Sequence, residues 1–186
     1  MFDFTAIQEW VTKNASTIFL ILFVLFRVWT VRKSLQGGEM PEVPGNKVET
    51  VSNMKEWNQR QEEAKKDKKV VVADFFATWC GPCKRASPEY QQMSLDFDEK
   101  TAMFLKINVD VATDVTTAMS VRSMPTFKVF KDGQEVQTIT GWDKNKINSL
   151  LKENGARPLT DEEKKQAAAA AADAAAGATA ETKKEQ

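Results

Sequence analysis

The chain has 186 residues, and its 26 lysine and arginine residues balance 26 aspartate and glutamate residues, so the formal net charge is zero. This length suits one domain with appendages, and the neutral balance argues against a global field that attracts nucleic acid. There is no histidine and there are only two cysteines, too few for a disulfide-rich secreted scaffold or for a zinc site, unless two chains share one. We therefore expect no metal and no cofactor.

Residues 1–33 contain the most apolar stretch. Residues 18–26 are nine consecutive apolar residues, and Trp10 and Trp29 flank them. A helix of about 19 residues at ~1.5 Å each spans about 28 Å, close to the ~30 Å hydrocarbon core of a bilayer. Tryptophan favours both bilayer interfaces. We predict an N-terminal membrane anchor, a single transmembrane helix at about residues 10–29; a buried helix of a soluble domain is the alternative.

The flanking charges predict an orientation for this anchor. Arg27, Arg32 and Lys33 follow the apolar residues, whereas Lys13 is the single basic residue before them. Basic residues favour the cytoplasmic side of a membrane span. We therefore expect the rest of the chain to face the cytosol, on the endoplasmic reticulum or the mitochondrial outer membrane. A cleaved signal peptide or a mitochondrial presequence fits poorly, because both need their basic residues earlier.

A linker and an alternating domain follow. Residues 34–46 hold three of the eight glycines and two of the six prolines, which is typical of a linker. Near-continuous apolar runs at 70–77 and 102–110 are typical of strands buried on both faces. Residues 126–130 and 135–140 are typical of a hairpin. The remaining predicted elements are a strand at 48–51 and helices at 53–66, 80–97, 114–120 and 144–154.

Strands separated by helices imply a parallel core, to which the hairpin adds antiparallel strands. The predicted class of the domain, residues 47–155, is therefore α/β, with a mixed central sheet flanked by helices. The tail, residues 156–186, is rich in alanine and charged residues, and Thr160 and Glu163 have the spacing of a capping box. We expect a partly helical or disordered tail, which lacks the large apolar side chains needed to dock strongly.

The two cysteines, Cys80 and Cys83, lie in the sequence WCGPC, directly after a buried strand and at the start of a helix. A helix N-terminus favours a thiolate, because unpaired amides and the positive end of the helix dipole face it. Pro82 falls in the first helical turn, where its missing N–H has no consequence. A ring this small adds little chain-entropy stabilisation. We interpret the pair as a reversible redox couple rather than a structural crosslink.

Two charged residues interrupt the buried strands. Asp74 lies within the first apolar run, and burial raises the pKa of a carboxyl group toward the range useful for proton transfer. Because the chain has no histidine, Asp74 is the predicted proton acceptor; an aspartate at a strand edge facing water is the alternative. Lys106 interrupts the second run. It lies near Asp74 if the two strands are neighbours, and otherwise it is a surface lysine.

These motifs resemble those of thioredoxin. The matching stretches are VVVADFFATWCGPCK, the helix proline Pro88, FLKINVD, VRSMPTFKVF, KDG and TGW, and they cover residues 47–155, about 109 of the 186 residues. WCGPC is specific within the superfamily, since protein disulfide isomerases typically carry histidine before the second cysteine and glutaredoxins typically have C-P-Y-C. The resemblance implies a thioredoxin fold and says nothing about the anchor or the tail.

The resemblance implies a catalytic role for four residues. Cys80 would be the exposed attacking thiolate, and Cys83 would be the buried resolving thiol. Asp74 would relay the proton of Cys83, and Lys106 would tune Asp74. The implied activity is that of a protein-disulfide reductase, a thiol-disulfide oxidoreductase that works on disulfide-containing client proteins, with a thioredoxin reductase as electron donor.

The resemblance also implies a substrate-contact surface. The bond between Met124 and Pro125 would be cis, which would place the Met124 backbone beside the disulfide to pair with an extended substrate segment. One departure is Phe76, where the family usually has tryptophan. Two alternatives to a tethered reductase stay open: a lumen-facing disulfide oxidase or isomerase, and a redox-inactive tethered binding module. The other contact residues implied are Trp79, Gly81, Pro82 and Gly141.

Overall fold

The computed structural model describes residues 13–35, 39–167 and 169. The chain divides into two compact units, Met1–Gly38 and Glu39–Gln186. Helix α2 (Ala15–Leu35) belongs to the first unit. Its large apolar side chains between Phe19 and Trp29 have exposed fractions of 50% to 73%. This helix therefore presents apolar surface along much of its length.

The transmembrane helix expected at about residues 10–29 is not supported by the structure. Within the part of the chain that the structure describes, no helix is long and apolar enough to cross a membrane. The uninterrupted apolar run of α2 has nine residues and ends before Arg27. At ~1.5 Å per residue this run covers about 13 Å, less than half of the ~30 Å hydrocarbon core. Residues 10–12 of the expected span lie outside the described residues.

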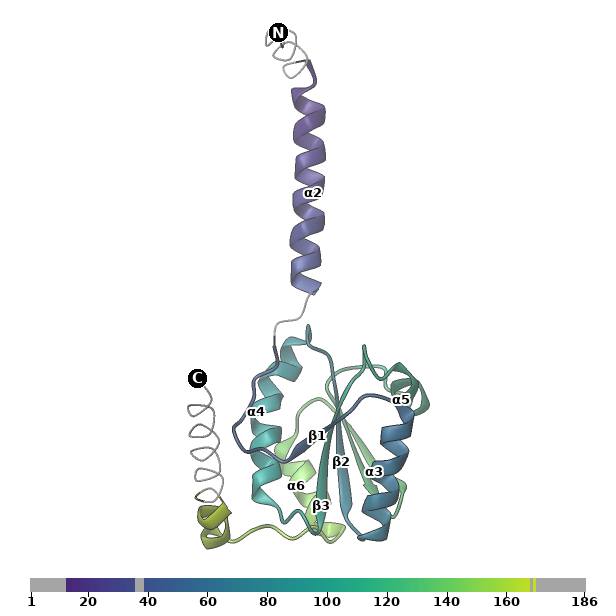
Figure 1. The fold of residues 1–186 in the computed structure, drawn as a ribbon, viewed down its shortest axis with the longest axis vertical. Coiled ribbons are helices and arrows are strands. Elements are labelled where there is room, and N and C mark those ends of the chain that lie inside the picture. Colours follow the sequence, from purple (N-terminus) through teal and green to yellow (C-terminus); the bar gives the residue numbers. More distant parts are fainter. Residues whose placement is uncertain (1–12, 36–38, 168, 170–186) are drawn as a thin grey trace, which may run out of the picture. The chain divides into compact units, whose positions relative to one another are not determined.

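The second unit contains a β-sheet (Figure 1). Its five strands lie in the order β1-β3-β2-β4-β5. β2 pairs in parallel with β3, which also pairs in parallel with β1. β4 is antiparallel to β2, and β5 is antiparallel to β4. The predicted α/β class with a mixed sheet is therefore confirmed. The strands are β1 (Val48–Val51), β2 (Val70–Phe76), β3 (Ala102–Asn108), β4 (Thr126–Lys131) and β5 (Gln134–Thr140).

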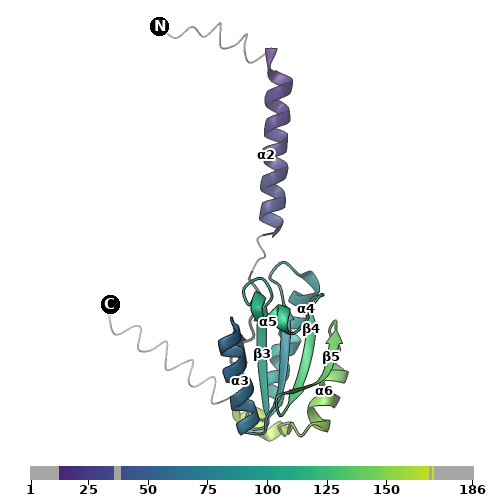
Figure 2. The same cartoon turned by 90° about the vertical axis from the view of Figure 1, so that its right-hand side faces the viewer.

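Helices cover both faces of this sheet (Figures 1 and 2). One core cluster joins one face of the sheet to α4 (Gly81–Asp96) and α6 (Lys144–Glu153). A second cluster joins the other face to α3 (Met54–Lys66) and α5 (Thr113–Ala118). All seven residues of β2 are buried, as expected for a central strand whose two faces are both covered.

Tyr90 fixes α4 on the centre of the sheet. Its ring packs against Phe127 with centroids 5.4 Å apart. Its hydroxyl lies 2.9 Å from the carbonyl oxygens of Val72 in β2 and Leu105 in β3. These contacts hold the helix that begins next to Cys80 against the two strands that carry Asp74 and Lys106.

Residues 39–47, which we call the strap, lie against α4. Gln91 of α4 is 2% exposed, and its side-chain amide forms hydrogen bonds with two backbone groups of the strap. Its Nε2 donates to the carbonyl oxygen of Pro41 at 2.7 Å, and its Oε1 accepts from the N–H of Val43 at 2.6 Å. Residues 39–46 of the strap were expected to belong to the linker at 34–46. The sequence did not reveal these contacts, because contacts made through backbone groups leave no periodic apolar pattern.

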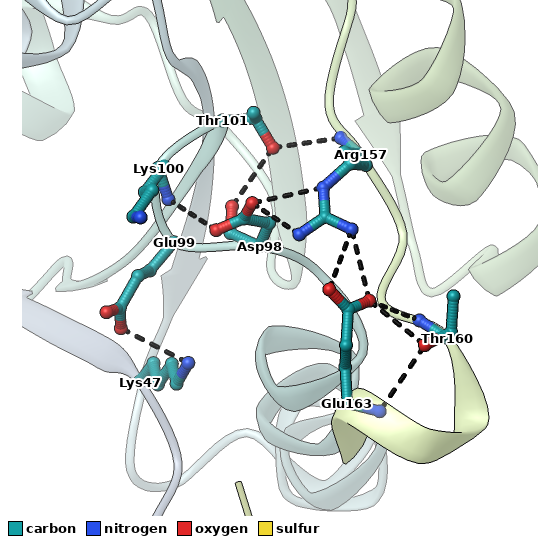
Figure 3. Close-up of polar contacts among 8 residues, drawn as sticks. All are labelled: Lys47, Asp98, Glu99, Lys100, Thr101, Arg157, Thr160 and Glu163. Atoms are coloured by element: carbon teal, nitrogen blue, oxygen red, sulfur yellow. Dashed lines mark hydrogen bonds and ion pairs between the residues drawn. The ribbon is translucent and has the colours of Figure 1, made fainter. Parts of the chain in front are cut away.

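The chain after α6 is held at the C-terminal end of α4 (Figure 3). Arg157 donates from Nε and Nη2 to Asp98 Oδ2 at 3.1 and 2.7 Å, and from Nη1 to both carboxylate oxygens of Glu163 at 3.1 Å. The predicted capping box forms, since the Thr160 N–H donates to Glu163 Oε2 at 2.8 Å. This docking was not expected, because it uses charged side chains instead of large apolar ones. Most of the alanine-rich stretch lies outside the described residues.

Candidate active site

Cys80 and Cys83 form a disulfide where β2 leads into α4, with Cα atoms 5.3 Å apart. Cys80 is the N-cap of α4, and its Sγ accepts a hydrogen bond from the backbone N–H of Cys83 at 3.2 Å. Pro82 lies in the first helical turn, as expected. The positive end of the helix dipole therefore lies at the sulfur atoms, where it stabilises a thiolate.

Both cysteines are buried in this disulfide form. Cys80 is 6% exposed and Cys83 is 1% exposed, so the expectation of an exposed Cys80 is wrong for the oxidised protein. The physical reason is local packing, because Phe76, Met40 of the strap and Met124 pack in the same cluster as the two cysteines. Phe76, the departure from the family's usual tryptophan, is also buried and packs in this cluster.

A cis peptide bond joins Met124 to Pro125 directly before β4, as the resemblance implied. Met124 is half-buried and belongs to the cluster around the cysteines. The N–H of Gly141 donates to the carbonyl oxygen of Pro125 at 2.8 Å. Gly141 has a φ of +83°, which glycine adopts without a steric penalty. The structure therefore brings three of the predicted contact residues together.

The other predicted contact residues lie at the surface beside the disulfide. Trp79, Gly81 and Pro82 are all exposed. Trp79 is 47% exposed, and its indole Nε1 donates to Asp110 Oδ2 at 2.8 Å. This hydrogen bond orients an apolar ring next to the cysteines. Asp110 was not among the predicted site residues; its position just after a buried strand was the signal that could have indicated it.

Asp74 is buried within β2, with 4% of its surface exposed, which excludes the alternative of a strand-edge aspartate facing water. Burial raises the pKa of Asp74 to about 8, and the positive charge of Lys106 opposes this rise. Asp74 Oδ1 has no hydrogen-bond partner among the described residues. The carboxyl group therefore exchanges its proton in the range where thiols ionise, which suits a proton acceptor for a cysteine.

Lys106 lies opposite Asp74 in the parallel register of β2 and β3, so the two strands are neighbours, the condition under which Lys106 was predicted to lie near Asp74. Both residues line a cavity of about 10 Å³, a volume that takes at most one water molecule. The Lys106 ammonium forms an ion pair with Glu42 of the strap, with Nζ and Oε1 2.8 Å apart. This contact lowers the pKa of Glu42. The sequence carried no signal for Glu42, which lies 64 residues from its partner.

A cysteine pair that forms a disulfide at a helix N-terminus, with a buried carboxyl group of raised pKa in the strand that leads into that helix, is suited to thiol-disulfide exchange. The fold and this site together define a thiol-disulfide oxidoreductase.

Comparison with known proteins gives the family. The thioredoxin family model matches residues 49–153. A thioredoxin of Coprinus comatus is 35% identical over 107 residues, which cover 58% of this chain and 97% of that protein. An H-type thioredoxin of Chlamydomonas reinhardtii is also 35% identical, over 60% of this chain and 98% of its own. A crystal structure of a thioredoxin from Nicotiana alata matches with a TM-score of 0.55 and 32% identity, over 63% of this chain and 98% of that one. The chain belongs to the thioredoxin family.

Proposed function

We propose that this thioredoxin is a protein-disulfide reductase. The observation that carries the proposal is the Cys80–Cys83 pair at the N-terminus of α4, packed in one cluster with Met124 of the cis bond. This arrangement supports attack on a client disulfide that lies along the Met124 backbone and against the exposed ring of Trp79. We further propose a thioredoxin reductase as the donor that restores the dithiol.

The reaction proceeds in two exchanges. The Cys80 thiolate attacks one sulfur of the client disulfide, and the other client sulfur leaves as a thiolate that takes up a proton. The Cys83 thiol then gives its proton to the Asp74 carboxylate and attacks Cys80 Sγ. The second client sulfur leaves as a thiolate and takes up the proton that Asp74 accepted, which restores the carboxylate, and Cys80 and Cys83 remain as the disulfide. Two electrons have passed from the cysteine pair to the client.

The direction of this exchange is tested by the reduction potential. We expect the Cys80–Cys83 couple to equilibrate with a dithiothreitol redox buffer at about −270 mV, the value typical of thioredoxin, and the reduced protein to reduce insulin. The proline within CGPC supports this expectation, since that sequence is typical of the reducing members. A potential near or above about −180 mV would instead make the protein a disulfide oxidase or isomerase.

We also propose that residues 1–33 attach the protein to a membrane and that the thioredoxin domain faces the cytosol, on the endoplasmic reticulum or the mitochondrial outer membrane. The exposed apolar side chains of α2 support attachment, because contiguous apolar surface of this kind marks contact sites for membranes or proteins. The three basic residues that follow the apolar run support the cytosolic orientation.

Fractionation and thiol labelling test both parts of this proposal. We expect the full chain to stay in the membrane pellet at physiological salt, and a chain beginning at Glu39, which keeps the strap, to move to the supernatant. In sealed organelles, a membrane-impermeant maleimide should label reduced Cys80 without detergent. Labelling only after detergent would place the domain in a lumen, and a full chain in the supernatant would contradict attachment.

A further inference from the structure

We propose that Glu42 of the strap is a positioning residue of the active site: its carboxylate engages the Lys106 ammonium, which would otherwise pair with Asp74, and so sets the proton affinity of Asp74. The inference rests on the proposed reductase mechanism, in which Asp74 receives the Cys83 proton. It also assigns a function to the strap, which precedes the residues matched by the family model.

The first observation is the position of the Lys106 ammonium. Lys106 and Asp74 are partners in adjacent parallel strands, so their side chains project from the same face of the sheet, and both line the same small cavity. A buried carboxylate next to an ammonium is expected to pair with it. Asp74 Oδ1 nevertheless has no hydrogen-bond partner among the described residues, while Lys106 Nζ lies 2.8 Å from Glu42 Oε1.

The second observation is that the strap backbone holds Glu42 in place. The residues on either side of it, Pro41 and Val43, are both hydrogen-bonded to the buried side chain of Gln91. An ion pair at a surface contributes little when two long side chains must lose their freedom to form it. Here the backbone on both sides of Glu42 is already fixed, which reduces that loss and favours the contact with Lys106.

Few titratable groups face Asp74 from the elements packed against it. β3 contributes Lys106, and α4 contributes Tyr90. Cys83 also belongs to α4 and becomes titratable in the reduced protein. β4 places the apolar Phe127 opposite Asp74. Burial raises the pKa of Tyr90 well above its usual range, so this phenol stays neutral. Among the described residues, Lys106 is therefore the cation that opposes the raised pKa of Asp74, and Glu42 competes with Asp74 for it.

The direct test is a carbon NMR titration of the Asp74 side-chain carboxyl group in the oxidised full-length protein. In Glu42→Gln, a negative charge is lost and Lys106 becomes free to pair with Asp74. We expect the midpoint of the Asp74 titration to fall by about one pH unit. Glu39→Gln is the matched control, since Glu39 is an exposed strap residue that forms no ion pair with a described residue. An unchanged midpoint in Glu42→Gln, or an equal fall in Glu39→Gln, would overturn the proposal.

A double-mutant cycle tests whether Glu42 acts through Lys106. Lys106→Met should raise the midpoint of the Asp74 titration, because the opposing cation is lost. In that background Glu42→Gln should have little further effect. The same fall with and without Lys106 would mean that Glu42 acts on Asp74 by another route, which contradicts the proposal. The disulfide stays oxidised and no client is present, so these outcomes do not depend on the reductase function.

A separate measurement tests whether Glu42 affects the second exchange, in which Cys83 attacks the mixed disulfide. With the reduced protein and 5,5′-dithiobis(2-nitrobenzoate), Cys80 displaces the first thionitrobenzoate, and attack by Cys83 on the mixed disulfide releases the second. We expect the pH profile of the second release to move down by the same amount in Glu42→Gln as the Asp74 midpoint. A moved midpoint with an unmoved profile would overturn the positioning role of Glu42 in the second exchange, while insulin reduction by the wild type would still support the reductase function.

Discussion

Cys80→Ser is expected to abolish insulin reduction, with a fall in rate of at least about 10³-fold. The serine hydroxyl stays protonated at neutral pH, so the first exchange with a client disulfide cannot begin, whatever the helix dipole contributes. The fold should be unaffected, because a ring closed between residues with a sequence separation of only 3 adds little stability. The measurement is the turbidity of precipitating insulin chains in the presence of dithiothreitol.

Cys83→Ser is the matched control, since it makes the same substitution three residues later. It keeps the Cys80 nucleophile and lacks the thiol that resolves the mixed disulfide. Client proteins should therefore accumulate as adducts that dithiothreitol releases. Adducts on Cys80→Ser but not on Cys83→Ser would reverse the assigned order of attack. Equal insulin reduction by the wild type and both variants would mean that the thiols are incidental and would favour the tethered binding module.

The sequence predicted those parts of the site that depend on strong local patterns. The apolar run of β2 predicted a central strand, and the position of Asp74 inside that run predicted a buried carboxyl group with a raised pKa. The short cysteine spacing at a helix start predicted the redox pair. Each of these inferences uses residues that are close in the chain, where periodicity and turn chemistry are informative.

The contacts that the sequence did not predict join residues far apart in the chain. Glu42 meets Lys106 across 64 residues, and the strap backbone meets Gln91 across about 50 residues. Charged and amide side chains of this kind occur throughout any soluble surface, so their identity does not indicate their partners. The burial of Cys80 was missed for a similar reason, because Met40 and Met124 reach it from distant segments.

Asp74→Asn is expected to make the oxidised protein more stable at neutral pH. Burial raises the pKa of Asp74 to about 8 in the folded protein, against an ordinary value of 3.8. The folded state therefore binds more protons than the unfolded state between these values, and the free energy of unfolding falls as pH rises from about 4 to about 8. At about 1.4 kcal/mol per pH unit, the decrease at pH 7 is roughly 4 kcal/mol.

Asparagine has the shape of aspartate and no charge, so Asp74→Asn should remove this decrease. Urea unfolding at pH 4 should give similar midpoints for the two oxidised proteins, and at pH 7 the variant should unfold at a clearly higher urea concentration. The same substitution removes the acceptor for the Cys83 proton, so release of the second thionitrobenzoate should slow by about 10²-fold. Equal midpoints at pH 7 would show that the Asp74 carboxylate is not desolvated in solution, and its role as the proton acceptor would then lose its physical basis.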